Sequence, residues 1–314
     1  MKKLLSVAVS ILVAACIFSG CKEKDGKIKI GVIQLVEHPA LDKSYQGFVD
    51  GLAEAGYKNG ENIVIDYQNA QGEQANCVTI ANKFVNDKDN LIFAIATPAA
   101  QAVANLTKKI PILVTAVTDP ETAKLVKSNK KPETNVSGTS DLTPVAAQIS
   151  LLKKIVPEAK TVGLLYCSSE ANSIFQINIA KEACKSNGLE FIEGSVSSSN
   201  EIQQVTQSLV GKVDAFYIPT DNMLAAGIAN VAMVANDAKI PTICGEDGMV
   251  VSGGLATYGI NYYELGKLTA KQAVKILGEN ANPADMPIEY LEKFDFSYNK
   301  ETANAIGITI PDNL

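Results

Sequence analysis

The sequence alternates apolar runs with amphipathic stretches, and it does so twice along the chain. Lys27–Gln34 is an apolar run rich in Ile and Val, and Leu41–Ala55 follows it with apolar residues on one helical face. The same order restarts at Pro144–Ile155, which precedes an apolar run over Thr161–Tyr166. Strands that alternate with helices of roughly 10–15 residues form βαβ units and parallel sheets. We therefore expect an α/β protein with two doubly wound lobes.

The remaining elements follow from the same patterns of apolar spacing, Gly and Pro. The further strands are predicted over Asn62–Tyr67, Leu91–Ala96, Ile110–Thr115, Leu189–Gly194, Val213–Ile218, Pro241–Cys244 and Gly254–Ile260. The further helices are predicted over Glu73–Val85, Pro98–Lys108, Asp119–Lys127, Ser173–Asn187, Asn200–Leu209, Asn222–Ala238 and Tyr262–Leu277. The polar stretch Lys127–Ser137 is predicted to be a surface loop. We expect an N-lobe of residues 27–142 plus 258–280 and a C-lobe of residues 143–257 plus 281–314.

The N-terminus has the pattern of an export signal. Two lysines precede an apolar run of 15 residues, Leu4–Phe18, which is shorter than the roughly 20 residues of a membrane span. Phe18-Ser19-Gly20-Cys21 resembles a bacterial lipoprotein signal. We expect a signal peptide over residues 1–20, lipid on Cys21 and a charged tether over residues 21–26. Cys16 is a second candidate for the lipid, and an ordinary secretory signal or an uncleaved anchor is the alternative.

Charge and composition exclude several classes of function. All 28 basic residues are lysines and 34 residues are acidic, which gives a net charge of −6. An acidic chain without arginine lacks the basic face that nucleic acids require. A single histidine, His38, excludes a multi-histidine metal site, and no metal or cofactor is predicted. Any bound carboxylate must be held by backbone N–H groups, hydroxyls, amides or lysine.

The cysteines do not form a redox or metal motif. Four remain beyond the signal, Cys77, Cys167, Cys184 and Cys244, and none belongs to a CxxC pair. Cys167 and Cys184 are expected at opposite ends of one strand–helix layer, too far apart for a disulfide. We expect four buried thiols.

Polar residues gather where the predicted strands end, which is the edge where open α/β sheets bind ligands. In the first half the segments that follow strands contain Gln34, His38, Thr97, Thr118 and Asp119. In the second half they contain Tyr166, Ser168, Thr220, Asp221, Asn222 and Glu246. Alternatively, Thr97, Asp119, Asp221 and Asn261 are helix N-caps, and the spacing from Asn261 to Glu264 is a capping-box pattern.

Catalytic motifs are missing from the sequence. It contains no GxSxG, P-loop, GxGxxG or HExxH pattern. No nucleophile motif accompanies His38, which is expected to line a site or the surface. Glu37, Asp119, Asp221 and Glu246 have no spacing that favours paired acid–base work. No catalytic residue is therefore predicted.

Several segments together resemble one family, the ABC-transporter substrate-binding lipoproteins of the tryptophan/tyrosine/phenylalanine type. They are Gln34–Asp42, Ala96–Gln101, Thr115–Pro120, Leu165–Ser173, Pro219–Asn222 and Gly259–Gly266. The resemblance runs from about Ile28 to Ile310. It implies a periplasmic-binding-protein type I fold, in which two Rossmann-like lobes joined by a hinge of three crossovers close on a small ligand. Asn261 departs from the family, in which Asp is expected.

The resemblance also implies a function and partners. The protein would be a monomeric receptor, lipid-anchored on the extracytoplasmic face of a bacterial cell membrane, that delivers an amino acid to an ABC permease and its ATPase. Related proteins bind aromatic amino acids, so Trp, Tyr or Phe is expected. An exported α/β enzyme and an adhesion or signalling lipoprotein of the same fold are the alternatives.

The expected binding roles follow from the chemistry of a free amino acid. The carboxylate is expected at the free N–H groups where the helix begins, at the segment Pro98-Ala99-Ala100, with the hydroxyls of Thr97 and Thr118. The ammonium is expected at Asp221, Asp119 or Glu246, supported by Asn222 or Gln34. Tyr166, His38 and Leu41 are candidates for the wall around the ring. The complete predicted set is Gln34, His38, Leu41, Thr97, Pro98, Ala99, Ala100, Thr118, Asp119, Tyr166, Ser168, Asn172, Thr220, Asp221, Asn222 and Glu246.

Overall fold

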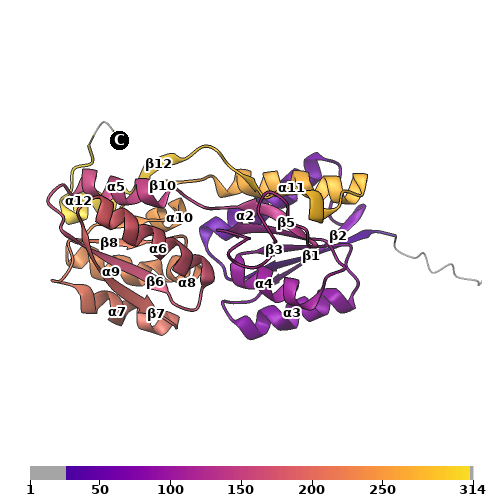
Figure 1. Ribbon diagram of the computed structural model, residues 1–314, viewed down its shortest axis with the longest axis horizontal. Helices are drawn as coiled ribbons and strands as arrows, with labels where there is room; N and C mark the ends of the chain where they lie inside the picture. Colours follow the sequence, from indigo (N-terminus) through magenta and orange to yellow (C-terminus); the bar gives the residue numbers. More distant parts are fainter. Residues whose placement is uncertain (1–25, 312–313) are drawn as a thin grey trace, which may run out of the picture.

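The computed structural model describes residues 26–311 and 314 and contains two α/β lobes, each built on a six-stranded sheet (Figure 1). The first sheet has the order β11 (Glu289–Tyr290), β5 (Val136–Ser140), β4 (Ile112–Val117), β3 (Leu91–Ile95), β1 (Ile28–Gln34) and β2 (Ile63–Asn69). The second has the order β12 (Asp295–Tyr298), β10 (Ala256–Gly259), β9 (Thr242–Cys244), β8 (Ala215–Ile218), β6 (Thr161–Cys167) and β7 (Glu190–Val196). All strand pairs are parallel except β10–β12. The prediction of two doubly wound α/β lobes is confirmed.

Helices cover both faces of each sheet, which is why the central strands are apolar throughout. The first lobe contains α2 (Pro39–Glu54), α3 (Gln74–Asn86), α4 (Thr97–Leu106) and α11 (Tyr262–Glu279). The second contains α5 (Val145–Ile155), α6 (Ala171–Ser186), α7 (Ile202–Leu209), α8 (Asn222–Ala226), α9 (Ile228–Asp237), α10 (Asp247–Val251) and α12 (Lys300–Ile306). Helices α2 and α11 lie together on one face of the first sheet (Figure 1). A Cβ on Gly47 or on Gly266 would overlap the backbone of the other helix, so this close approach requires glycine.

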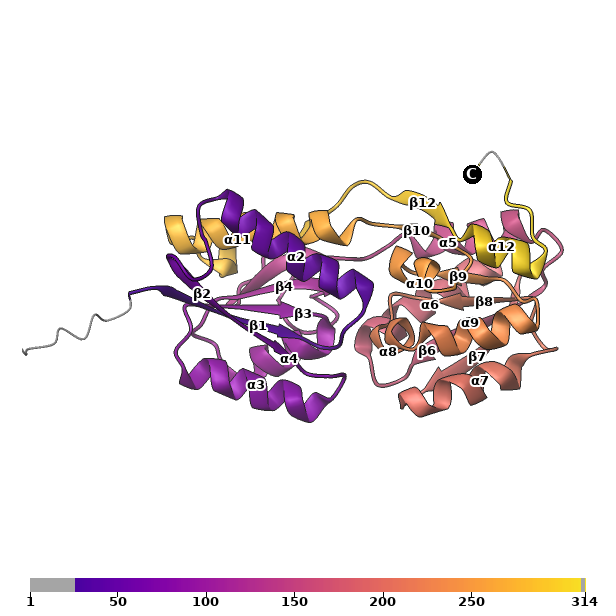
Figure 2. The same ribbon diagram turned by 180° about the vertical axis from the view of Figure 1, so that it is seen from behind.

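The chain crosses between the lobes three times, at residues 141–144, 260–261 and 291–294. Figure 2 shows the last crossing as the yellow segment that leads into β12. Two boundaries differ from the predicted ones. Tyr258 and Gly259 belong to the second sheet through β10, and β11 pairs with β5 of the first sheet. The predicted C-lobe segment 281–314 is therefore divided, because Ile288 and its neighbours pack into the first core.

Several predicted elements are also corrected. Residues 119–127 form turns rather than a helix, because the Asp119 Oδ1 accepts from the N–H groups of Glu121 and Thr122 and Lys124 has φ of 61°. The predicted helix over 222–238 is divided at Gly227 into α8 and α9. Strand β5 begins at Val136, inside the predicted loop.

The four cysteines of the described part are free and buried, as expected. The predicted signal peptide, Cys16 and Cys21, and most of the tether lie outside the described residues. Within residues 26–311 we find no helix long and apolar enough to cross a membrane.

Candidate functional site

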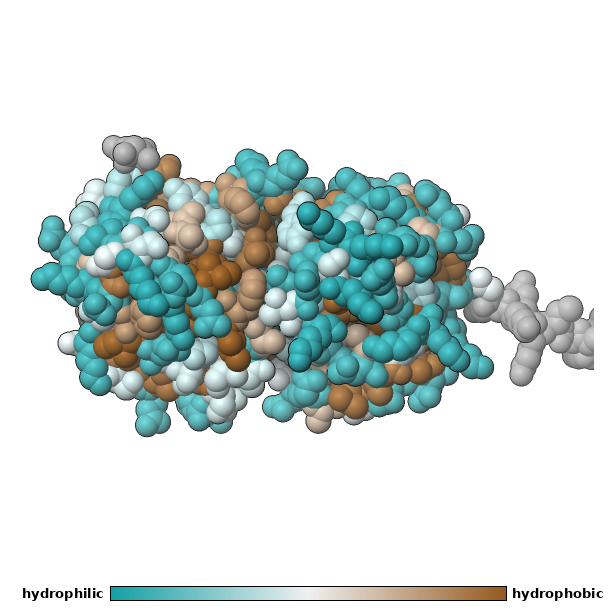
Figure 3. Space-filling view, viewed as in Figure 1, coloured by the Kyte–Doolittle hydropathy of each residue, from teal (hydrophilic) through white to brown (hydrophobic). Residues whose placement is uncertain are grey.

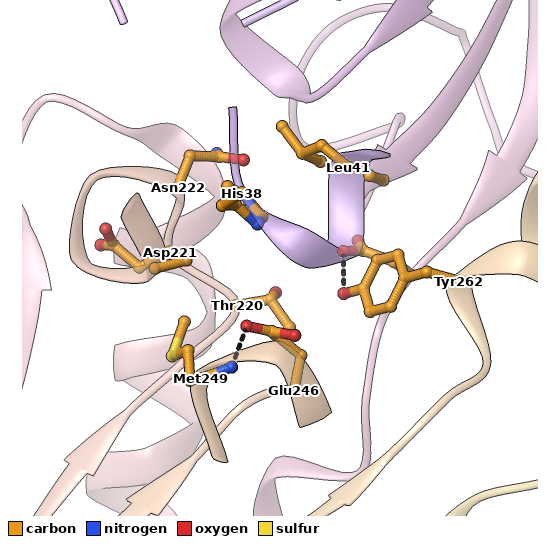
Figure 4. A pocket seen from close by; sticks show the side chains of 11 residues that line it. His38, Leu41, Thr220, Asp221, Asn222, Glu246, Met249 and Tyr262 are labelled. Carbon is orange, nitrogen blue, oxygen red and sulfur yellow. Dashed lines mark hydrogen bonds between the residues drawn. The ribbon is translucent and has the colours of Figure 1, made fainter. Parts of the chain in front are cut away.

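The carboxyl ends of the strands in both sheets face the junction between the lobes. Figure 3 shows the lobes meeting along a narrow seam, with hydrophobic residues along one side of it and hydrophilic residues over the outer parts of both lobes. Within the junction lies a narrow cavity of about 10 Å³, roughly the space that a single water molecule needs, so the two lobes are nearly closed on each other. It is lined by His38, Leu41, Ala116, Asp141, Thr220, Asp221, Asn222, Ala225, Glu246, Met249 and Tyr262 (Figure 4).

Several predicted residues meet in this cavity. His38 and Leu41 come from the start of α2, and the other predicted residues, Thr220, Asp221, Asn222 and Glu246, follow β8 and β9. Thr118 lies beside them at the end of β4. Its hydroxyl oxygen is 3.3 Å from that of Thr220 and accepts from the Nε2 of Gln176 at 3.2 Å, so it joins the two lobes directly.

A second narrow cavity in the same junction contains other predicted residues. Thr97 and Asp119 of the first lobe face Asn172 of the second across this cavity, which is also about 10 Å³. The Thr97 hydroxyl and the Asn172 Oδ1 are buried without a hydrogen-bond partner. Pro98, Ala99 and Ala100 form the first turn of α4 next to Thr97. Two buried polar atoms near a helix N-terminus thus stay available to a ligand.

Three predicted residues serve other contacts. The buried Gln34 amide donates to the Val36 carbonyl at 2.9 Å and to the Asp42 carboxylate at 2.6 Å, which fixes the loop after β1. The Tyr166 hydroxyl donates to Glu193 on β7 at 2.9 Å. The exposed Ser168 hydroxyl donates to the Val196 carbonyl. Neither Tyr166 nor Ser168 lines the cavity, so the aromatic residue in its wall is Tyr262 instead.

Two of the cavity carboxylates are used by the backbone. Asp221 accepts from the N–H of Leu224 at 2.8 Å and of Cys167 at 2.6 Å, one bond to each oxygen. Glu246 accepts from the N–H groups of Gly248 and Met249. The N-cap interpretation is therefore confirmed for Asp221, and it also holds for Asn261, which accepts from the Glu264 N–H. It is wrong for Thr97, because the N-cap of α4 is Ala96.

Glu170 supports this part of the site and escaped the sequence prediction. Its carboxylate accepts from the side-chain amides of Asn172 and Asn222 and from the Met223 N–H. Burial, and next the charge of Asp221, raise the pKa of Glu170 to about 7. Glu170 sits at the end of β6, yet nothing in its local sequence distinguishes it from an ordinary surface acid.

Asp141 and Tyr262 are the other residues that sequence reasoning missed. Asp141 follows β5 directly and is 4% exposed. Its Oδ2 accepts from the Tyr262 hydroxyl at 2.8 Å, and its Oδ1 has no partner. Burial raises the pKa of Asp141 to about 6, and the hydrogen bond from Tyr262, together with the nearby Thr118 hydroxyl, limits the rise. Because no strand was predicted at β5, its end was not searched for polar residues.

His38 adds a neutral polar group. It is 7% exposed, and neither ring nitrogen makes a hydrogen bond of good geometry with the described residues. Burial lowers the pKa of His38 to about 4, an effect that the nearby Asn222 amide offsets only in part. The neutral imidazole therefore offers one donor and one acceptor to the cavity.

The charges around the cavity favour a ligand with a positive group. Asp141, Asp221 and Glu246 line it, and no lysine is among its described lining residues. The lysine that reaches the seam, Lys43, forms an ion pair of 3.0 Å with Asp247 across the lobes. Leu41, Ala116, Ala225 and Met249 supply the apolar part of the wall.

Known proteins resemble the chain over almost its full length. The family described as ABC transporter substrate binding protein matches residues 29–314. A tyrosine-binding protein of Clostridioides difficile is 43% identical over 321 residues, which cover 98% of this chain and 93% of that protein. The crystal structure of a Streptococcus pneumoniae domain in complex with L-Trp is 41% identical, covers 91% of this chain and 96% of its own, and aligns with a TM-score of 0.88.

A third relative indicates the state of the lobes. The ligand-free, open structure of a Clostridium difficile substrate-binding protein with adhesive properties is 49% identical over 91% of this chain and 97% of its own, with a TM-score of 0.70. This value is lower than that of the L-Trp complex despite the higher identity, so the lobes here lie in the arrangement of the ligand-bound relative. The fold, the cavity between closed lobes and the match over residues 29–314 agree, and the chain belongs to the ABC transporter substrate-binding protein family.

Proposed function

We propose that this protein captures a free aromatic L-amino acid between its lobes and delivers it to the permease of an ABC importer. The observation that carries the proposal is the closed cavity, which combines acidic groups, a neutral imidazole and apolar side chains. Similar proteins are named for tyrosine binding or contain L-Trp. The apolar wall suits an aromatic ring, and the acidic groups suit an ammonium.

The carboxylate of the amino acid would lie toward the first turn of α4. The chain has no arginine, so backbone N–H groups, hydroxyls, amides or lysine must hold an anion, and the first two are what the first turn of α4 offers. Supporting this, the Thr97 hydroxyl is buried and unpaired beside that turn, and the Thr118 hydroxyl lies 3.3 Å from that of Thr220, which lines the first cavity. Helix N-termini favour negative groups.

The protein would act outside the cytoplasm, as expected for the receptor component of an importer. Residues 1–20 would be removed as a signal peptide, and Cys21 would carry the lipid that holds the protein on the membrane. We expect Cys21→Ser to release the protein from the membrane fraction and to remove the lipid from its intact mass. Lipid that persists on this variant would move the site to Cys16.

Calorimetry with L-Tyr, L-Trp and L-Phe tests the proposed ligand class. At least one of the three should bind with an affinity that a sugar or nucleoside does not match. Mass spectrometry of the ligand recovered after incubation separates a receptor from an enzyme, because a receptor returns its ligand unchanged. Binding of a sugar or nucleoside alone would replace the ligand class, and a chemically altered ligand would favour the enzyme alternative.

A further inference from the structure

The three acidic side chains that line the cavity differ in what their oxygens bind. Both oxygens of Asp221 and both oxygens of Glu246 accept backbone N–H groups. Asp141 alone among them keeps a carboxylate oxygen, Oδ1, that is buried and without a partner. A buried polar atom without a partner costs free energy, and a buried charge costs more. A hydrogen-bond donor to the Asp141 Oδ1 is therefore missing from the cavity.

The position of Asp141 is fixed from two sides. The Ser140 hydroxyl donates to the Thr118 carbonyl at 2.7 Å and accepts from the Leu142 N–H at 3.1 Å, which holds the turn that follows β5. The Tyr262 hydroxyl donates to Oδ2 at 2.8 Å, drawn as a dashed line in Figure 4. Tyr262 begins α11 directly after the crossing at residues 260–261, and Asp141 begins the crossing at residues 141–144. The free oxygen thus stands at the hinge end of the cavity.

We propose that Asp141, rather than Asp221 or Glu246, receives the α-ammonium of the ligand through Oδ1, and that Tyr262 is a positioning residue that holds its other oxygen. This assignment rests on the proposed function. An ammonium supplies both the missing donor and the missing positive charge, and no lysine lines this cavity to do so. Hydrogen bonds between charged groups are among the stronger ones in proteins.

The assignment implies that protons compete with the ligand. Burial raises the pKa of Asp141 to about 6, so the ligand-free site takes up a proton just below neutral pH. An ammonium binds the ionised form, and affinity should fall roughly tenfold at pH 5. The groups that face Asp141 are the Tyr262 hydroxyl on α11, His38 at the start of α2, Asp221 before α8, and Glu246 with Asp247 at α10. Several of these groups also titrate, so the dependence of affinity on pH must be compared between the wild type and the Asp141→Asn variant.

The experiment is calorimetry on the full-length protein with L-Tyr and with its desamino analogue, 3-(4-hydroxyphenyl)propionate, between pH 5 and 8. The wild type should prefer L-Tyr. Asp141→Asn should weaken L-Tyr binding by roughly 10- to 150-fold, as for the loss of a hydrogen bond to a charged group. The same variant should bind L-Tyr and the desamino analogue with similar affinity, and its affinity for L-Tyr should no longer decrease below pH 6. If L-Trp binds more tightly than L-Tyr, L-Trp and its desamino analogue replace the L-Tyr pair in this experiment.

Asp89→Asn is the matched control. Asp89 is also a buried aspartate with an unpaired oxygen and a pKa raised to about 6. Asp89 precedes β3, whereas Asp141 follows β5. The two residues therefore lie at opposite ends of the parallel strands, Asp89 at the amino ends and Asp141 at the carboxyl ends. Asp89→Asn should leave affinity, ligand preference and pH profile unchanged.

Tyr262→Phe keeps the ring and removes the hydroxyl that lowers the pKa of Asp141. It should move the midpoint of the wild-type pH profile upward, and it tests the assignment even if Asp141→Asn does not fold. The assignment of Asp141 to the ammonium would be overturned if Asp141→Asn still preferred L-Tyr over the desamino analogue and still lost affinity below pH 6, whatever the size of its affinity. A wild type that binds none of the aromatic amino acids would instead overturn the proposed function.

Discussion

Asp141, Asp221, Glu246 and Asp89 are all buried aspartate or glutamate side chains, yet their surroundings give them different roles. Asp221 accepts from the Leu224 N–H at the start of α8 and from the Cys167 N–H at the end of β6, and both oxygens of Glu246 accept from N–H groups at the start of α10. Both side chains therefore stabilise helix ends. Asp141 and Asp89 each keep an oxygen that nothing in the described structure satisfies. Asp141 opens to the ligand cavity, whereas Asp89 packs against Phe84 and Gly31 in the first lobe.

Asp89 should therefore destabilise the fold when it is ionised. Burial, and next the charges of Asp87 and Asp66, raise the pKa of Asp89 from an ordinary value of 3.8 to about 6. Between these values the unfolded chain loses its proton first, so the stabilisation present at acid pH decreases as pH rises and is gone above about pH 6. We expect Asp89→Asn to raise the free energy of unfolding by about 1–2 kcal/mol at pH 8, a value discounted for partial solvent access.

Urea denaturation at pH 8 and pH 4 measures this effect. The gain at pH 8 should shrink at pH 4, where the wild-type carboxyl is protonated in the folded state and only partly ionised in the unfolded chain. A gain of the same size at both pH values would show that ionisation is not the cause. Asp237→Asn, a change at an exposed position at the end of α9 in the other lobe, is the control and should have little effect.

At the scale of elements, β5 shows how a strand of small polar residues becomes part of a core. Its sequence, Val-Ser-Gly-Thr-Ser, is buried throughout. The Thr139 hydroxyl lies 3.0 Å from that of Thr115 on β4 and 2.8 Å from that of Thr269 on α11. These hydroxyls join strand, neighbouring strand and covering helix. The strand in turn places Asp141 at the hinge.

Thr139→Val removes the central hydroxyl at nearly constant volume. The Thr269 hydroxyl still donates to the Leu265 carbonyl, but the buried Thr115 hydroxyl loses its partner. We expect a loss of about 1–3 kcal/mol in the free energy of unfolding. Thr79→Val is the control, since Thr79 lies exposed on α3 and bonds only to the carbonyl one turn earlier. Similar losses for both variants in urea denaturation would contradict the role of the hydroxyl chain.

Sequence patterns predicted the elements whose buried positions are occupied by apolar residues. Strands such as β1 and β3 are apolar because helices cover both faces of the sheet. The pattern failed for β5, whose burial depends on hydroxyl pairs, and for β11, which has only two residues. Both errors had consequences, since β5 leads to Asp141 and β11 returns residues 289–290 to the first lobe.

The candidate site was predicted in part for a related reason. Residues that directly follow apolar strands, such as His38 and Asn222, were placed correctly at the edge of the sheets. Which oxygen stays free depends instead on contacts between distant segments. Tyr262 reaches Asp141 across 121 positions of sequence, and the Asp221 oxygen accepts from Cys167 across 54. A pattern of neighbouring residues in the sequence cannot predict pairs that lie so far apart along the chain.

At the scale of the whole molecule, the two lobes are held together by a few polar contacts around the ligand cavity. The hydroxyls of Thr118 and Thr220 lie 3.3 Å apart, and Gln176 of α6 donates to Thr118. Lys43 and Asp247 pair at 3.0 Å, but both are partly exposed, and such pairs contribute only about 0–1 kcal/mol. A weakly held closed state lets a ligand that contacts both lobes shift the equilibrium.

A disulfide between the lobes tests whether closure retains the ligand. With hydroxyl oxygens 3.3 Å apart, Thr118 and Thr220 are suited to replacement by a cysteine pair, whereas an open protein would hold the two far outside bonding range. The native Cys77, Cys167, Cys184 and Cys244 are buried and should not interfere. We expect the double variant Thr118→Cys/Thr220→Cys to oxidise faster in the presence of L-Tyr, because ligand binding increases the closed population.

The rate at which labelled L-Tyr leaves the oxidised double variant then reports on the hinge. The oxidised protein should release ligand much more slowly than the reduced protein, and a reductant should restore release. The reduced double variant and each single variant show what the substitutions themselves do to affinity. If oxidation is equally fast with and without ligand, or the oxidised protein releases L-Tyr at the reduced rate, closure of the lobes does not govern retention. Slow release confined to the oxidised form would mean that the permease must reopen the hinge to obtain the ligand, since the cavity at Asp141 is otherwise shut between the lobes.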